Sequence, residues 1–133
     1  MIDSKSAHEV EEAEWLARYI VYKDHVRANG TVRPDAFIPH PYPNLSVTRH
    51  LSLGDDMLWM IGQDIAEQRG KTLCGRADLQ AMTCTQQHLR IEADPTEGNP
   101  NHANVAGWPA SKPEQKIIAM KLAASSNFLR HSN

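Results

Sequence analysis

The sequence predicts an α+β fold in which a small, mainly antiparallel sheet packs with about three helices. Three segments space their apolar residues as amphipathic helices do, and four others alternate apolar and polar residues as half-buried strands do. The two kinds of segment do not alternate regularly, which disfavours a doubly wound parallel sheet. The chain has 133 residues and no linker-like stretch, so residues 1–133 are expected to form a single domain.

The N-terminal segment predicts a helix over residues 7–28. Ser6 and Glu9 have the spacing of a capping box, and Asn29 with Gly30 supplies a stop. Acidic residues gather in the first turns and basic residues in the last, which complements the helix dipole. The expected apolar face consists of Trp15, Tyr19, Tyr22 and Val26.

Residues 36–109 are expected to form the α+β core. Four prolines between residues 34 and 43 forbid a helix at its start. A second helix is expected over residues 54–69, and a helical turn over residues 83–88 is left open. The apolar stripe of the helix over residues 54–69 consists of Met57, Met60, Ile61 and Ile65, and Trp59 lies outside this stripe. The expected strands cover residues 45–49, 72–80, 89–93 and 102–107.

The C-terminal segment predicts a third helix over residues 112–129. Ser111 and Glu114 form another capping box, and apolar residues recur at helical spacing as far as Phe128. This helix should pack on the sheet, because its apolar stripe needs a layer that covers it.

Three short motifs resemble those of a family of small bacterial proteins that have no assigned activity. They are an F-x-P stretch, an LSV-x-R strand and a late NP-x-HA-x-I/V segment. Here they are residues 37–39, residues 45–49 and residues 99–105. The resemblance covers most of residues 18–109, and it implies a shared fold and no particular reaction.

Composition excludes several classes of protein. The 14 Lys and Arg against 16 Asp and Glu give a net charge of −2, which argues against a basic nucleic-acid binder. No apolar run approaches the roughly 18 residues of a membrane helix. The N-terminus lacks the apolar core of a signal peptide, and two cysteines without an export signal indicate reduced thiols. A cytoplasmic protein is therefore expected, with no membrane partner, and a homo-oligomer is left open.

His102 is the first candidate functional residue. It follows Asn99 and Asn101 and precedes Asn104, so polar side chains surround it. An imidazole in this position could act as a general acid or base, or hold a phosphate. Alternatively, His102 and the asparagines satisfy backbone groups of a turn. The sequence alone leaves both interpretations open.

Arg49 and Arg76 are candidates for an anion clamp. Arg49 ends an expected strand, where a guanidinium can bind a carboxylate or phosphate in a bidentate manner. Its structural alternative is an internal salt bridge to Asp55, Asp56 or Asp78. Arg76 and Asp78 share one face of a strand, and the simpler interpretation is a solvent-facing charged pair.

The sequence predicts no cofactor and no metal site. It contains neither a glycine-rich phosphate loop nor the paired spacing of zinc ligands, although seven histidines are present. A site assembled in space from His50, His88 and His102 is the one metal arrangement left open.

The candidate residues are consistent with two functions. The preferred hypothesis is a non-enzymatic accessory module that binds a protein partner through Trp15, Trp59 and Trp108, with Asn104 beside them. The alternative is a small enzyme that acts on a phosphate-bearing substrate, a nucleotide or nucleic acid. In that case His102 would be the acid or base and Arg49 and Arg76 the clamp. The enzyme requires these three residues to converge in one cleft, whereas the module predicts that they are scattered or internally paired.

Overall fold

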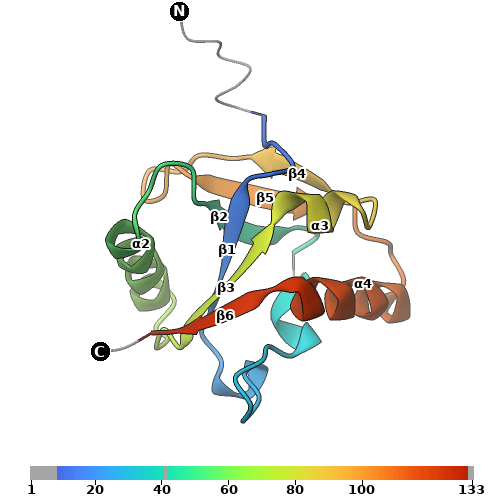
Figure 1. The fold of residues 1–133 in the computed structure, drawn as a ribbon, viewed down its shortest axis with the longest axis horizontal. Helices are drawn as coiled ribbons and strands as arrows, with labels where there is room; N and C mark the ends of the chain where they lie inside the picture. Colours follow the sequence, from blue (N-terminus) through green and yellow to red (C-terminus); the bar gives the residue numbers. More distant parts are fainter. Residues whose placement is uncertain (1–8, 41, 132–133) are drawn as a thin grey trace, which may run out of the picture.

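A computed structural model describes residues 9–40 and 42–131. Its centre is a six-stranded antiparallel sheet in the order β4-β5-β2-β1-β3-β6 (Figure 1). The strands are β1 (Trp15–Ile20), β2 (Leu45–Arg49), β3 (Gly75–Gln80), β4 (Arg90–Ala93), β5 (His102–Ala106) and β6 (Asn127–Arg130). The helices are α2 (Asp55–Gln68), α3 (Ala81–Thr85) and α4 (Lys112–Ser125), with short 3-10 turns η1 (Lys23–His25) and η2 (Pro34–Phe37). The expected α+β fold is confirmed.

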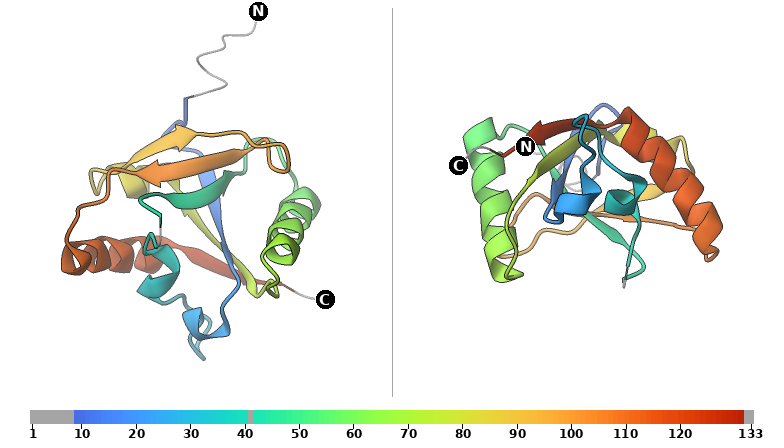
Figure 2. Two further views of the ribbon diagram at one scale, coloured as in Figure 1. Left: turned by 180° about the vertical axis from the view of Figure 1, so that it is seen from behind. Right: turned by 90° about the horizontal axis from the view of Figure 1, so that it is seen from below.

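The sheet buries both of its faces. Alternate residues of β1 point to opposite sides: Leu16 and Ile20 join a core cluster with α4 and η2, whereas Ala17 and Tyr19 join a second cluster with α2. Figure 2 shows α2 and α4 on opposite flanks of the sheet. The central strand β1 is therefore covered on both sides.

The prediction of a helix over residues 7–28 is wrong. The segment from 15 to 20 is the strand β1, which pairs with β2 on one side and β3 on the other, and η1 follows it. A strand covered on both faces has a continuous apolar run, and such a run cannot be told from a buried helix by periodicity. Ser6, half of the expected capping box, lies outside the described residues.

The prediction of the second helix is confirmed, but its buried face differs from the expected stripe. Met57 and Met60 are 44% and 53% exposed, and the buried residues are Leu58, Ile61, Gly62 and Ala66. The Tyr19 ring lies so close to Gly62 that a Cβ there would be 2.5 Å from the ring. Because glycine has no side chain, residue 62 lets this face of α2 pack closely against the Tyr19 ring of the sheet.

The third helix ends earlier than expected. Ser111 accepts a hydrogen bond from the Glu114 amide, which confirms the predicted cap, but α4 stops at Ser125. The last residues instead form the edge strand β6, which pairs with β3. In this strand Phe128 lies opposite Ala77 and packs against the larger core cluster, so the sheet rather than the helix takes up this aromatic ring.

The remaining strand predictions are confirmed to within a few residues, and α3 occupies part of the segment left open as a helical turn. In the described part of the chain, no helix has the length and apolar character needed to span a bilayer.

Candidate functional site

The most distinctive feature of the sheet is a split between β1 and β2. The two strands pair only at Leu16 with Arg49 and at Ala17 with Thr48, and then they diverge (Figure 2). The Trp15 carbonyl accepts a hydrogen bond from the His50 amide, which identifies Ala17 and Thr48 as a hydrogen-bonded pair.

The next hydrogen-bonded pair would be Tyr19 with Ser46, two residues farther along each strand, and it is not formed. The Arg18 side chain enters the split instead. Its Nε donates to the Ala36 carbonyl at 2.8 Å and its Nη1 to the Ser46 carbonyl at 3.0 Å. A guanidinium thus replaces a backbone amide at Ser46 and holds the two strands apart.

A cavity of about 460 Å³ opens at this split. Four basic side chains line it, and none of the described residues around it is an aspartate or a glutamate. The basic residues are Arg18 from β1, Arg69 from the end of α2, His40 from the loop before β2, and His102 from β5. The apolar part of the lining includes Val21, Ile38, Leu45, Val47 and Ile65.

A second cavity, of about 340 Å³, adjoins the first. Arg18, Arg69 and His40 line both cavities, and Asp35 is the one carboxylate among the described residues of the second. Arg18, Arg69 and His40 therefore lie between two cavities, and the first of these has no aspartate or glutamate among its described lining residues.

Arg18 is held in an environment that does not favour its charge. Burial of the guanidinium lowers the pKa of Arg18 to about 10, and the positive charge of Arg69 contributes in the same direction. The hydrogen bonds that Arg18 makes go to carbonyl oxygens rather than to a carboxylate. The side chain remains protonated at neutral pH, so the cavity contains a positive charge without a described counter-ion.

His102 lines the same cavity with its ring held in place. Its Nδ1 lies 2.8 Å from the Asp94 carbonyl oxygen and 3.3 Å from the Asp94 carboxylate. Nδ1–H donating to that carbonyl leaves Nε2 as the ring atom that a ligand could meet. Asn104 donates to the same Asp94 carboxylate at 3.0 Å, so its side chain belongs to this arrangement.

The neighbouring asparagines serve the backbone. Asn99 accepts from the Asn101 amide and donates to the Thr48 hydroxyl, while Asn101 donates to the Arg49 carbonyl. These contacts confirm the turn-forming interpretation for Asn99 and Asn101.

Arg49 does not line either cavity. It makes a bidentate ion pair with Glu14, with Nε and Nη2 each 2.8 Å from a carboxylate oxygen, and its Nη2 also donates to the Glu9 carbonyl. An internal salt bridge was the structural alternative, but the partner is Glu14 rather than one of the expected aspartates. Burial alone would raise the pKa of Glu14, yet the hydrogen bonds from Arg49 and from the Glu11 backbone outweigh it and lower that pKa.

Arg76 and Asp78 form the predicted pair, but the pair is buried and not solvent-facing. The two residues are 3% and 7% exposed, and Arg76 Nε lies 3.1 Å from each Asp78 oxygen. Arg76 also binds Asp55 at 2.7 Å and lies over the Trp59 ring, and His50 contacts Asp78 at 3.2 Å. The pair is buried because α2 and the residues that precede it cover this end of the sheet.

The clamp residues and the histidine therefore do not converge. Of Arg49, Arg76 and His102, His102 alone lines one of the two cavities, and the two arginines are engaged by internal carboxylates. The enzyme hypothesis required these three residues to line one cleft, and in the structure they do not.

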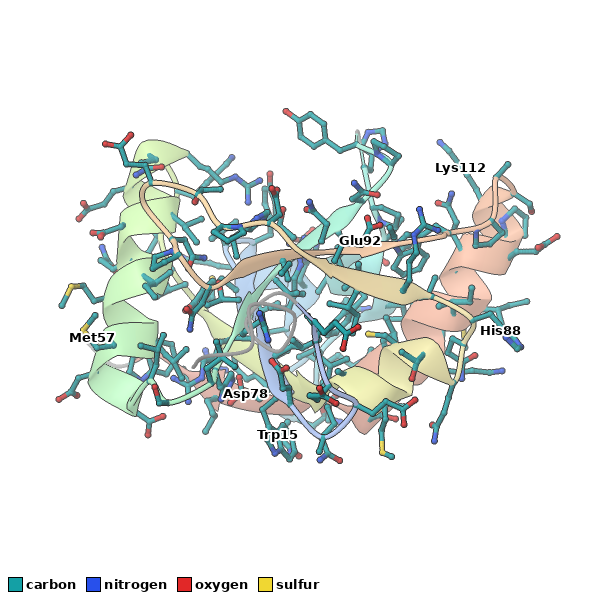
Figure 3. All side chains as sticks on the ribbon, turned by 90° about the horizontal axis from the view of Figure 1, so that it is seen from above. Trp15, Met57, Asp78, His88, Glu92 and Lys112 are labelled. Atoms are coloured by element: carbon teal, nitrogen blue, oxygen red, sulfur yellow. The ribbon has the colours of Figure 1, made fainter. Side chains whose placement is uncertain are left out.

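The three tryptophans differ in their surroundings. Trp15 is 41% exposed and lies at the margin of the molecule, whereas Asp78 lies farther in (Figure 3). Trp59 is half-buried between Arg76 and His131, and Trp108 packs on the larger core cluster with its indole N–H donating to the Val105 carbonyl. Of the three expected anchors, Trp15 is thus the one that is exposed rather than half-buried.

Within the described residues, no cluster of three or more His, Cys, Asp or Glu side chains is arranged to hold a metal ion. His50 and His102 contact different aspartates, Asp78 and Asp94, and His88 lies far from α2 in Figure 3. The three-histidine arrangement left open by the sequence is not formed.

Sequence reasoning missed Arg18 and Arg69. Arg18 lies within the segment that the sequence predicts as the N-terminal helix, where a single arginine between apolar residues is typical of a surface position. The available signal was an arginine inside the apolar run that forms β1, because a charge in a buried strand needs a special environment.

The chain was compared with protein-family models, with curated proteins and with solved structures, and nothing matches it in any of the three. The resemblance to a family of small bacterial proteins therefore stays a prediction.

Proposed function

We propose that this protein is a non-enzymatic binding module that takes an anionic ligand in the cavity between β1 and β2. The observation that carries the proposal is the lining: Arg18, Arg69, His40 and His102 surround the cavity, without a described carboxylate. Buried or half-buried cations usually have an acidic partner, as Arg49 and Arg76 have here. An anion would supply that partner for Arg18.

The cavity has the size and mixed lining of a small-ligand site. Its volume of about 460 Å³ lies within the usual range for such sites, and apolar side chains share the walls with a few polar groups. A binding role needs only these features. Catalysis would also need an acid or base beside a positioned reacting group, and His102 alone does not provide that.

The protein-partner hypothesis stays a prediction beside this one. Its support is the exposed ring of Trp15, since interface anchors favour tryptophan. The two hypotheses are compatible if the anion belongs to a partner protein.

The experiment is a titration with inorganic phosphate and with acetate, followed by amide and side-chain NMR. We expect the chemical shifts of residues around Arg18 and Arg69 to move together in a saturable way. Arg69→Gln should weaken binding by at least about tenfold, because a charge-assisted hydrogen bond contributes roughly 1.5–3 kcal/mol.

The matched control is Arg33→Gln. Arg33 is an exposed arginine that lines neither cavity, so this variant changes the net charge equally and should bind as the parent protein does. Equal weakening by both variants would show a non-specific charge effect, and an absence of shifts around the cavity would refute the proposal.

A further inference from the structure

We propose that the anion is the carboxyl terminus of an extended peptide, which enters the split as an added strand and places its carboxylate beside Arg18. This inference rests on the proposed function and names the ligand of the same site. It identifies the partner by chemistry: a protein whose free C-terminal segment ends in an apolar residue.

The first argument is the backbone that the split leaves unpaired. Because Ala17 and Thr48 are the last paired residues, the peptide groups of Tyr19 and Ser46 face the gap rather than each other. The Ser46 carbonyl is taken by Arg18, but both amide N–H groups and the Tyr19 carbonyl have no hydrogen-bond partner within the described part of the chain. β1 therefore offers a donor and an acceptor on one side of the split, and β2 offers a donor on the other side, all of which an extended backbone can pair with.

The second argument is the position of the positive charge. Arg18 follows directly after the last paired residue, so its guanidinium lies at the closed end of the split. Its two hydrogen bonds use Nε and Nη1, which leaves the Nη2 amino group for a ligand. A peptide that enters from the open end would bring its C-terminus to this amino group. The anion at the C-terminus of a peptide is a free carboxylate.

The third argument is the apolar part of the lining. Ile38 from the segment after η2, Val47 from β2 and Ile65 from α2 line the same cavity as the basic groups. They offer contacts to an apolar side chain near the carboxylate, which is how pockets beside an added strand give specificity.

A phosphate group fits these walls less well. α2 ends at the cavity, where Arg69 is its C-terminal cap, and the C-terminal end of a helix carries partial negative charge. The partial negative charges of this helix end and of the Tyr19 carbonyl would repel a phosphate dianion. A monoanionic carboxylate followed by peptide N–H groups has donors for these acceptors.

The test compares a six-residue peptide that ends in Val or Leu as the free acid with the same peptide as the C-terminal amide, both against the full chain. We expect the amide to bind at least about tenfold more weakly, because it loses the charge-assisted hydrogen bonds. Hydrogen exchange gives a second readout: the acid should protect the Tyr19 and Ser46 amides, whereas acetate and inorganic phosphate should leave them unprotected.

The outcomes separate the two proposals. If inorganic phosphate binds at the cavity but the acid and amide peptides bind equally, the peptide inference fails and the anion site stands. Tighter binding by a nucleoside monophosphate than by the free-acid peptide would also overturn the inference. If neither the anions nor the peptides shift the cavity residues, both proposals fail.

Discussion

At the scale of single residues, the sheet separates two kinds of arginine. Arg49 and Arg76 are buried and have carboxylate partners, which makes them structural residues. Arg18 is held by carbonyl oxygens alone, and Arg69 is exposed beside the same cavity. The difference in partners, rather than the residue type, distinguishes a structural guanidinium from one that can serve a ligand.

The ion pair between Arg49 and Glu14 should contribute strongly to stability. Both side chains are well shielded from solvent, at 5% and 12% exposure, so removing the Glu14 charge weakens two charge-assisted hydrogen bonds in a poorly solvated place. We expect Glu14→Gln to lower the free energy of unfolding by about 2–4 kcal/mol in urea denaturation. Glu97→Gln, at an exposed position, is the matched control and should change it little. A similar loss in both variants would contradict the structural role of the pair.

The same pair should give the protein an acid-sensitive component of stability. The pKa of Glu14 lies below its ordinary value of 4.5 in the folded protein, so its contribution is fully present above pH 4.5. That contribution is lost as pH falls through the lowered pKa, because the unfolded chain then binds the proton more readily. The stability difference between the parent protein and Glu14→Gln should therefore shrink below pH 4.5 in denaturation measurements. A difference that stays constant down to pH 2.5 would show that Glu14 is not the group responsible.

At the scale of elements, the contact between α2 and β1 depends on a missing side chain. A Cβ at Gly62 would lie 2.5 Å and 2.6 Å from two atoms of the Tyr19 ring. Gly62→Ala should thus destabilise the protein by about 1–3 kcal/mol, although alanine is the better helix former. Thermal or urea unfolding measures this, and Gly98→Ala, whose nearest neighbour is a flexible glutamine end at 3.9 Å, is the control. A stabilised Gly62→Ala would mean that the ring can move aside at little cost.

The elements also show what the sequence can and cannot predict. Strands whose apolar and polar residues alternate, such as β2, and helices with clear caps, such as α4, follow from local pattern, and the sequence predicts them. Local pattern predicts a helix for β1 because both faces of that strand are buried, and for β6 because its burial depends on pairing with the distant strand β3. Local periodicity contains no information about such pairing.

The candidate site was harder to predict than the fold. His102 was identified from its polar neighbours, and it does line the cavity. An internal salt bridge was one of the two interpretations of Arg49, but Glu14 lies 35 residues away along the chain, so local pattern does not identify it as the partner. The split that exposes Arg18 arises where two strands diverge, which is a property of the sheet and not of either segment.

At the scale of the whole molecule, the two faces of the sheet are unequally covered. The cluster on the α4 side includes buried residues from five of the six strands or from the segments next to them, together with η2 and α3. The cluster on the α2 side is much smaller, and it adjoins the cavity through Tyr19, Val21 and Ile65. The layer next to the candidate site is therefore the less strongly held of the two.

This asymmetry predicts the order in which the molecule opens. Elements with fewer buried apolar contacts open at lower free energy than the main core. We expect the amides of α2, such as that of Ile61, to exchange at a lower free energy of opening than those of α4, such as that of Leu122, in native-state hydrogen exchange. A ligand that bridges β1 and the end of α2 should raise the opening free energy of α2 and leave that of α4 unchanged. Equal opening free energies for both helices would indicate that the two layers unfold as one unit, and the cavity would then have no independently mobile wall.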